Sequence, residues 1–199
     1  MPALSRVIPV SAFAGSMASG EKTRLPFPLW RLGTYDGVRR SAIIAWKHQL
    51  NRELDARMCA QFRQRGREIA PILLDAGLTR IALVPAPSRR RRKKDGLFVV
   101  GKFASALCDG LRDGGIGASV ADVLTIDEKV VERRAKASAV ACVAPIGRNV
   151  PVGLVDDVLV TGSTLAGCAR AIEKSGGRVC CVFVVAQQEK MSEKIEKTR

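Results

Sequence analysis

The chain has 199 residues and is 47% hydrophobic, which excludes an intrinsically disordered protein and provides enough apolar side chains for one domain with a full core. Its formal net charge of +14 indicates an anionic partner, but charge alone does not choose between nucleic acids, nucleotides and diphosphates. The six cysteines form no C-x-x-C pair and there is one histidine, so a zinc ribbon and a histidine metal cluster are excluded.

Residues 1–24 resemble a secretory signal peptide only weakly. The apolar run after Arg6 is short, and Pro9 and Ser11 interrupt it. No stretch of the chain approaches the ~18 consecutive apolar residues of a membrane span. We therefore expect a flexible N-terminal extension and no membrane partner. Free thiols within apolar patterns suit a reducing compartment, so a cytoplasmic location is predicted.

Residues 25–78 predict a small N-terminal hood that is mostly helical. The segment starts extended because of its prolines and then turns at a Tyr-Asp-Gly sequence. A helix follows, with its apolar face directed inward and Lys47 at the margin of that face. A second helical pattern spans residues 53–76 and is expected to weaken at Gly66 and Pro71.

Residues 79–187 predict the core of the protein, which begins with a first buried parallel strand at 80–87. The loop after this strand contains Ser88 and then six consecutive basic residues, Arg89 to Lys94. Because the loop follows the carboxyl end of a strand, we expect it to overhang the same edge of the sheet as Asp156. That position favours binding of a diphosphate or a nucleic acid over a merely solvated surface.

The next elements are a predicted helix over 97–111 and a predicted short strand near 119–126. About twenty residues separate that strand from the next, and such a length beside a site is typical of a mobile lid. Its charged residues include Glu132, Arg133, Arg134 and Lys136. They either lie over a bound anion or form an exposed helix with paired charges, and the sequence leaves both alternatives open.

The stretch 151–167 reads PVGLVDDVLVTGSTLAG and is the strongest candidate for a binding site. An apolar strand pattern ends in two adjacent carboxylates, Asp156 and Asp157, and a turn then opens a helix pattern. Gly162 reaches backbone angles that are closed to other residues. The amides of residues 161–165 can therefore converge on an anion.

Ser163 or Thr164 is expected to cap the helix that follows this turn, and the first free N–H groups and dipole of that helix also favour a phosphate. Two commoner phosphate motifs do not fit. Gly162 and Gly167 have the glycine spacing of a P-loop, but Cys168 occupies the position of the required lysine. No strand pattern leads into a G-x-G-x-x-G sequence either.

The order of the remaining elements fixes the predicted fold class. A helix over 164–174 is followed by an apolar run at 178–186 that is typical of a strand covered on both faces. The polar tail, 188–199, is expected to be flexible. Strands thus alternate with helices, which predicts an α/β fold with a mostly parallel sheet flanked by helices.

The strand, acid pair and turn resemble the signature of type I phosphoribosyltransferases, which bind 5-phosphoribosyl 1-diphosphate (PRPP). The resemblance implies a fold of that type, with Asp156 and Asp157 on the ribose hydroxyls and Mg²⁺ beside Asp157. It implies that the 5-phosphate is held by Thr161, Gly162, Ser163, Thr164 and Leu165. The diphosphate is then expected at Ser88, Arg89, Arg90, Lys93 and Lys94. Arg133 is expected to close over it and to act in catalysis together with the two acids.

Three further segments narrow the resemblance to the ComF family of competence-associated proteins. They are Tyr35-Asp36-Gly37 leading to Lys47-His48, VPAPSRRRRKKDG at 84–96, and ERRAK at 132–136. With the acid-pair signature they span residues 33–186 in family order. Unlike many members, this chain has no N-terminal zinc ribbon.

The resemblance implies an enzyme that binds PRPP with Mg²⁺ and transfers ribosyl phosphate, a pentosyl group, to a nucleophile with release of diphosphate. The alternative is a non-catalytic PRPP- or DNA-binding protein that acts in DNA uptake, which the net charge of +14 and the basic loop at 89–94 favour. The sequence identifies neither the acceptor nor the oligomeric state, and it leaves a homodimer open.

Overall fold

The computed structural model describes residues 26–35, 37–48, 50–88, 94–126 and 140–188. The elements in chain order are β1 (Leu29–Thr34), α1 (Gly37–His48), α2 (Arg52–Asp75), β2 (Arg80–Pro85), α4 (Val99–Asp113), β3 (Gly117–Val120), β4 (Leu124–Ile126), β5 (Val140–Cys142), β6 (Pro151–Leu159), α6 (Ser163–Lys174) and β7 (Arg178–Gln187). None of the helices in these ranges is both long enough and apolar enough to cross a membrane.

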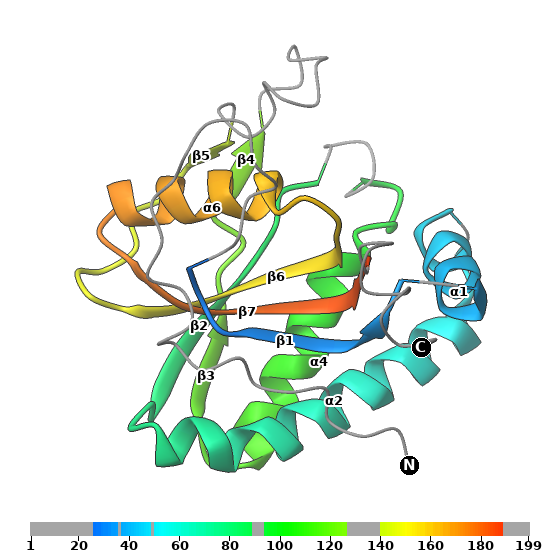
Figure 1. The fold of residues 1–199 in the computed structure, drawn as a ribbon, viewed down its shortest axis with the longest axis horizontal. Coiled ribbons are helices and arrows are strands. Elements are labelled where there is room, and N and C mark those ends of the chain that lie inside the picture. Colours follow the sequence, from blue (N-terminus) through cyan, green and yellow to red (C-terminus); the bar gives the residue numbers. More distant parts are fainter. Residues whose placement is uncertain (1–25, 36, 49, 89–93, 127–139, 189–199) are drawn as a thin grey trace, which may run out of the picture.

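A five-stranded sheet in the order β1-β7-β6-β2-β3 forms the centre of the molecule, and all of its neighbouring strands are parallel. Helices α2 and α4 cover one face of this sheet and α6 covers the other (Figure 1). Strands β4 and β5 form a separate antiparallel pair. The predicted α/β class, with a parallel sheet flanked by helices, is confirmed.

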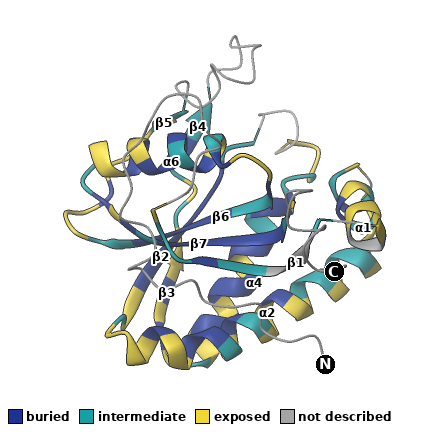
Figure 2. Cartoon of the chain, in the orientation of Figure 1, coloured by how far each residue is buried: buried dark blue, intermediate teal, exposed yellow. Residues whose placement is uncertain are grey.

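The core has two layers because successive strand residues point to opposite faces of the sheet. On β2, Ile81 and Leu83 belong to the apolar cluster beneath α2 and α4, whereas Ala82 and Val84 belong to the cluster beneath α6. The central strands are therefore buried on both sides, as Figure 2 shows for β6 and β7. This explains why residues 179–186, which follow the exposed Arg178, are apolar at every position.

Two strand predictions need correction. The first strand of the sheet is β1 and not the 80–87 segment, because the extended residues before α1 pair with β7 along the edge of the sheet, from Leu29↔Val182 to Thr34↔Gln187. The single strand expected at 119–126 is also wrong. The chain leaves the sheet after β3 and forms β4, whose partner is β5, so parts of the expected strand and lid form a ribbon of their own.

The helix α2 was expected to weaken at Gly66 and Pro71, but it runs unbroken through both residues. Packing against α4 is the reason. A Cβ atom on Gly66 would lie 2.5 Å from the carbonyl oxygen of Leu107, so the missing side chain lets the two helix backbones approach closely. This contact between helices outweighs the low intrinsic helix propensity of glycine.

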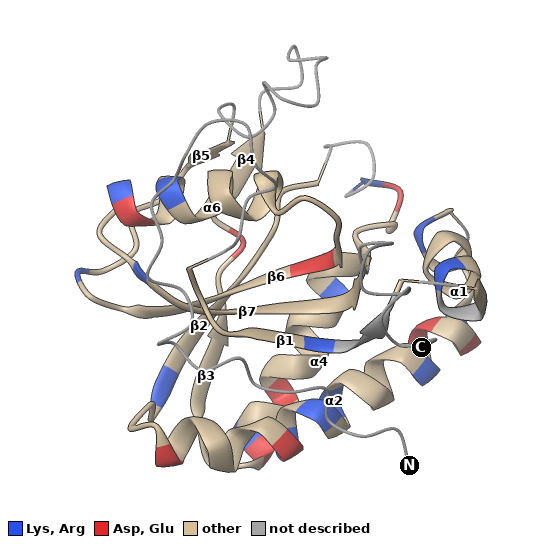
Figure 3. Ribbon diagram, viewed as in Figure 1, with Lys and Arg blue, Asp and Glu red and all other residues tan. Residues whose placement is uncertain are grey.

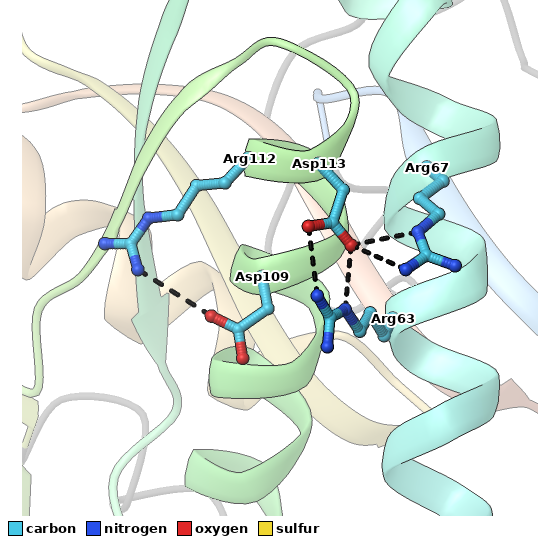
Figure 4. A network of polar contacts seen from close by, with 5 residues as sticks. All are labelled: Arg63, Arg67, Asp109, Arg112 and Asp113. Atoms are coloured by element: carbon cyan, nitrogen blue, oxygen red, sulfur yellow. Dashed lines mark hydrogen bonds and ion pairs between the residues drawn. The ribbon is translucent and has the colours of Figure 1, made fainter.

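A cluster of ion pairs also joins α2 to α4 (Figure 4). Arg63 Nε and Arg67 Nη2 lie 2.7 Å and 2.8 Å from Asp113 Oδ2. Asp109 and Arg112 form a looser pair on α4 at 3.7 Å. The hydrogen bonds from Arg63, and then those from Arg67, lower the pKa of Asp113 from 3.8 to about 2.

Asp113 should therefore contribute to stability above its unfolded-state pKa of 3.8, and this contribution should be lost as the pH falls through about 2. We expect Asp113→Asn to lower the melting temperature at neutral pH and to match the wild type at about pH 2. Thermal melts across this range test the prediction, with Asp109→Asn as the control because its ion pair is looser. The prediction would be contradicted if the melting temperature of Asp113→Asn were lower than that of the wild type by the same amount at every pH.

Candidate functional site

The carboxyl ends of β2 and β6 meet where the strand order of the sheet reverses. From β2 the chain continues through α4 to β3, whereas from β6 it continues through α6 to β7 on the other side. Because α4 and α6 cover opposite faces, these two strand ends form a switch point, and open α/β sheets bind ligands in the crevice outside the strand ends at such a point. Ala86 N donates to Val155 O at 2.7 Å, so the loop after β2 starts beside the acid pair.

The acid pair, Asp156 and Asp157, lies near the carboxyl end of β6, and the two side chains leave the strand in opposite directions. Asp157 Oδ2 lies 2.5 Å from Lys47 Nζ on α1. Asp156 lies toward α6, on the same face of the strand as Leu154, which packs in the cluster beneath that helix. In Figure 3 the acidic segment near the carboxyl end of β6 lies on the same side of the molecule as α1.

The two acids differ in ionisation. Burial, and then repulsion by Asp157, raises the pKa of Asp156 from 3.8 to about 8. A hydrogen bond of 2.8 Å from the backbone N–H of Asp157 to Asp156 Oδ1 and the charge of Lys47 both oppose this rise. Asp156 is therefore mostly protonated in the free protein at neutral pH.

The turn after β6 has the predicted conformation. Gly162 has φ +78°, the left-handed region that favours glycine. The hydroxyl oxygens of Thr161 and Ser163 lie 3.1 Å apart, and Ser163 N donates to Thr161 Oγ1 at 3.4 Å. Both hydroxyls thus gather at the start of α6, where Thr164 and Leu165 complete the first turn.

The expectation that Ser163 or Thr164 caps α6 is wrong. The N-cap residue is Gly162, which has no side chain, and no side-chain hydrogen bond caps the helix. The left-handed turn places the helix start one residue earlier than the serine and threonine pattern suggests. Because the first N–H groups of a helix have no partner within it, they are open to an acceptor from outside the chain.

Lys47 is a site residue that sequence reasoning placed at the margin of its helix. Its side chain is 23% exposed and that of Asp157 is 14% exposed, so this ion pair is more shielded than a surface pair. The available signal was a lysine in the last turn of a helix that precedes the sheet. Its partner is more than a hundred residues away in sequence, and only the tertiary fold identifies it.

A second polar bridge fixes the position of α1. Trp46 is 1% exposed, and its Nε1 donates to Asp55 Oδ1 on α2 at 2.6 Å. Lys102 Nζ on α4 lies 2.6 Å from Asp55 Oδ2. Burial alone would raise the pKa of Asp55, but the hydrogen bonds from Lys102 and Trp46 outweigh it and lower that pKa. Residues of α1, α2 and α4 thus meet at the carboxylate of Asp55. Trp46, the α1 residue among them, directly precedes Lys47, which contacts Asp157.

The predicted site residues divide into two groups. The structure brings together the acid pair and the turn at 161–165, which follow one another at the carboxyl end of β6. Of the predicted diphosphate residues, Ser88 and Lys94 are described, whereas Arg89, Arg90 and Lys93 lie outside the described residues, as does Arg133. Within the described ranges, no group of three or more His, Cys, Asp or Glu side chains could hold a metal ion.

A cavity of about 590 Å³ lies next to the site and does not contain the acid pair. It is lined by Pro85 and Gly96, near the two ends of the β2–α4 loop, and by Phe98 and Asp122. Its volume suits a small organic molecule. The β2–α4 loop therefore borders two spaces, the crevice at the acid pair and this cavity against α4.

No protein-family model matches the chain, and no curated protein matches it. Among solved structures, the chain is similar to the crystal structure of a purine phosphoribosyltransferase from Pyrococcus horikoshii Ot3. The two share 22% sequence identity, and the match covers 63% of this chain and 83% of the other with a TM-score of 0.36. This likeness adds no residue to the site described above.

Proposed function

We propose that the chain is a phosphoribosyltransferase-like protein that binds PRPP with Mg²⁺ in the crevice between β2 and β6. The observation that carries the proposal is the position of the acid pair directly before the left-handed turn at Gly162 and the uncapped start of α6. A diol-binding pair of carboxyl groups and an anion-binding helix start therefore lie at one strand end. A ribose 5-phosphate unit has both of the groups that these features bind.

The ribose hydroxyls would bind Asp156 and Asp157. Asp157, which the ammonium group of Lys47 contacts, can accept hydrogen bonds, whereas a neutral Asp156 can both donate and accept one. The 5-phosphate would lie at the turn, where backbone N–H groups of the first turn of α6 would donate to it. The hydroxyls of Thr161 and Ser163, which contact each other in the free protein, would turn toward it. Binding of the phosphate needs no deprotonation of a protein group.

The residues at the strand end fit a Mg²⁺ ion only together with a ligand. Magnesium typically takes one or two carboxylates and completes its shell with substrate phosphates and water. Asp157 supplies a carboxylate oxygen, although Lys47 already contacts it in the free protein. When bound, the ion would neutralise charge on the diphosphate, with Asp157 holding it directly or through water.

For a transfer reaction, the contribution of the chain is to position and to neutralise charge. The bond between the ribose C1 and the diphosphate oxygen breaks, the diphosphate leaves with the bonding electrons, and a nucleophile adds to C1. Cationic side chains of the β2–α4 loop, including Lys94, would stabilise the leaving diphosphate. Within the described residues, no histidine or carboxylate stands out as a general base, and the acceptor is left open.

Membership of the ComF family, with a role in competence, belongs to this proposal. Of the segments that carry the resemblance, the described ones include Lys47 at the end of α1 and the ends of the 84–96 stretch. The ion pair between Lys47 and Asp157 links two of these segments, which supports reading them as parts of one site. The ERRAK segment lies outside the described residues.

The proposed function is tested by calorimetric titration of the wild type with PRPP, with and without Mg²⁺. We expect saturable binding that depends on Mg²⁺ and that Asp157→Ala weakens by about a hundredfold, because a hydrogen-bonded charge is lost from a shielded site. Glu173→Ala is the matched control, since it removes an exposed carboxylate from the far end of α6. A folded wild type that does not bind PRPP would contradict the proposal, and binding of DNA across a salt series would then be measured.

A further inference from the structure

The carboxyl end of α1 lies between the acid pair and the loop that follows β2. On one side, Lys47 Nζ contacts Asp157 Oδ2 at 2.5 Å. On the other side, Leu50 lies against Gly96, where an added Cβ would be 3.5 Å from Leu50 Cδ2. Gly96 is near the end of the β2–α4 loop, the loop that also begins beside Val155 through Ala86. Asp157 points to the face of the sheet opposite α6, as Val155 does, so the ammonium group that contacts it lies on the side of the acid pair away from α6.

This placement leaves the ammonium free to make a further contact. The backbone of α1 is fixed by the buried Trp46 and its hydrogen bond to Asp55, so the lysine does not depend on Asp157 for its position. An ammonium group has three donors, and the Lys47 side chain is 23% exposed. It can therefore hold Asp157 and donate to an anion in the crevice at the same time.

The direction of the ligand follows from the two ends of the site. With the 5-phosphate at the start of α6 and the ribose on the acid pair, the rest of the ligand extends away from α6 and toward the β2–α4 loop. That is the side on which Lys47 lies. A ligand with an anionic group on the ribose C1 would meet the ammonium, whereas ribose 5-phosphate would not.

We propose that Lys47 is the specificity-determining residue of this site, bridging Asp157 and the 1-diphosphate so that the protein selects PRPP over ribose 5-phosphate. This role rests on the proposed function. This role also gives a reason for the position of Lys47. A lysine that served only as the counterion of Asp157 would not need to lie on the side of the acid pair that faces the β2–α4 loop.

The test compares the dissociation constants of PRPP and ribose 5-phosphate, both with Mg²⁺, for the wild type and Lys47→Met. We expect Lys47→Met to weaken PRPP by at least about tenfold, the effect of losing a hydrogen bond to a charged group, and ribose 5-phosphate by less than about threefold. Lys47→Arg should retain most of the preference because it keeps the charge. Lys174→Met removes the same charge from the exposed end of α6 and should change neither constant.

Equal weakening of both ligands by Lys47→Met, or no weakening, would overturn the role of Lys47 while leaving the proposed function intact. A wild type that binds neither ligand would overturn the proposed function and this role with it.

Discussion

Gly110→Ala is expected to destabilise the folded protein by about 3 kcal/mol, although alanine is the better helix former by roughly 0.5–1 kcal/mol. The reason is the contact between α2 and α4. A Cβ atom on Gly110 would lie 1.9 Å from the carbonyl oxygen of Arg63, so one of the two helices must move. The opposing Gly66 is also confined, although less tightly, with Leu107 O at 2.5 Å from its added Cβ. The clash exceeds the gain in propensity because backbone atoms cannot rotate away.

The control is Gly101→Ala, which lies on the same helix. Its added Cβ would lie 2.6 Å from the ring of Phe98, a side chain that can turn aside. We expect Gly101→Ala to stay within about 1 kcal/mol of the wild type. Urea denaturation of both variants measures the difference, and Gly110→Ala should also melt roughly 10 °C lower. A Gly110→Ala protein as stable as Gly101→Ala would show that the helices pack farther apart than described.

Asp156→Asn is expected to stabilise the ligand-free protein by several kcal/mol at pH 8 and to change its stability little near pH 4. The sign follows from the raised pKa, which burial and the charge of Asp157 bring to about 8. A carboxyl group with this pKa favours the folded state only while it is protonated. Its ionisation lowers stability progressively as the pH rises from 3.8 to about 8. Asparagine has the same shape and accepts the 2.8 Å hydrogen bond from Asp157 N, but it cannot ionise.

The neighbouring substitution Asp157→Asn is the matched control, and the opposite result is expected. It leaves the 23% exposed ammonium of Lys47 without its charged partner, so it should lower stability by about 1 kcal/mol at neutral pH. Denaturation curves of both variants across the pH range measure the two effects. If Asp156→Asn is less stable than the wild type at pH 8, Asp156 is ionised and favourably paired, contrary to the structure. Under the proposed function, the more stable variant should also bind PRPP more weakly, as sites that bind ligands often trade stability for function.

The local parts of the fold and site were predictable from the sequence because short-range patterns determine them. The continuous apolar runs of β2, β6 and β7 and the helical period in α4 and α6 identified these elements to within a few residues. The left-handed turn at Gly162 follows from the conformational freedom of glycine. Prediction was weaker where neighbours in space override local preference. Gly66 does not weaken α2, because the helix that it contacts compensates for its low propensity.

What the sequence determined by itself is the α/β class and the order of acid pair, turn and helix at the end of β6, since these depend on residues close together in the chain. The tertiary structure decided three things that depend on distant residues. Pairing with β7 makes β1 part of the sheet, and the reversal of strand order places β2 beside β6. The packing of α1 brings Lys47 to Asp157 and leaves Asp156 without a comparable partner. Long-range contacts of this kind arise from burial of surfaces that no short segment specifies, so they could only be seen in the folded chain.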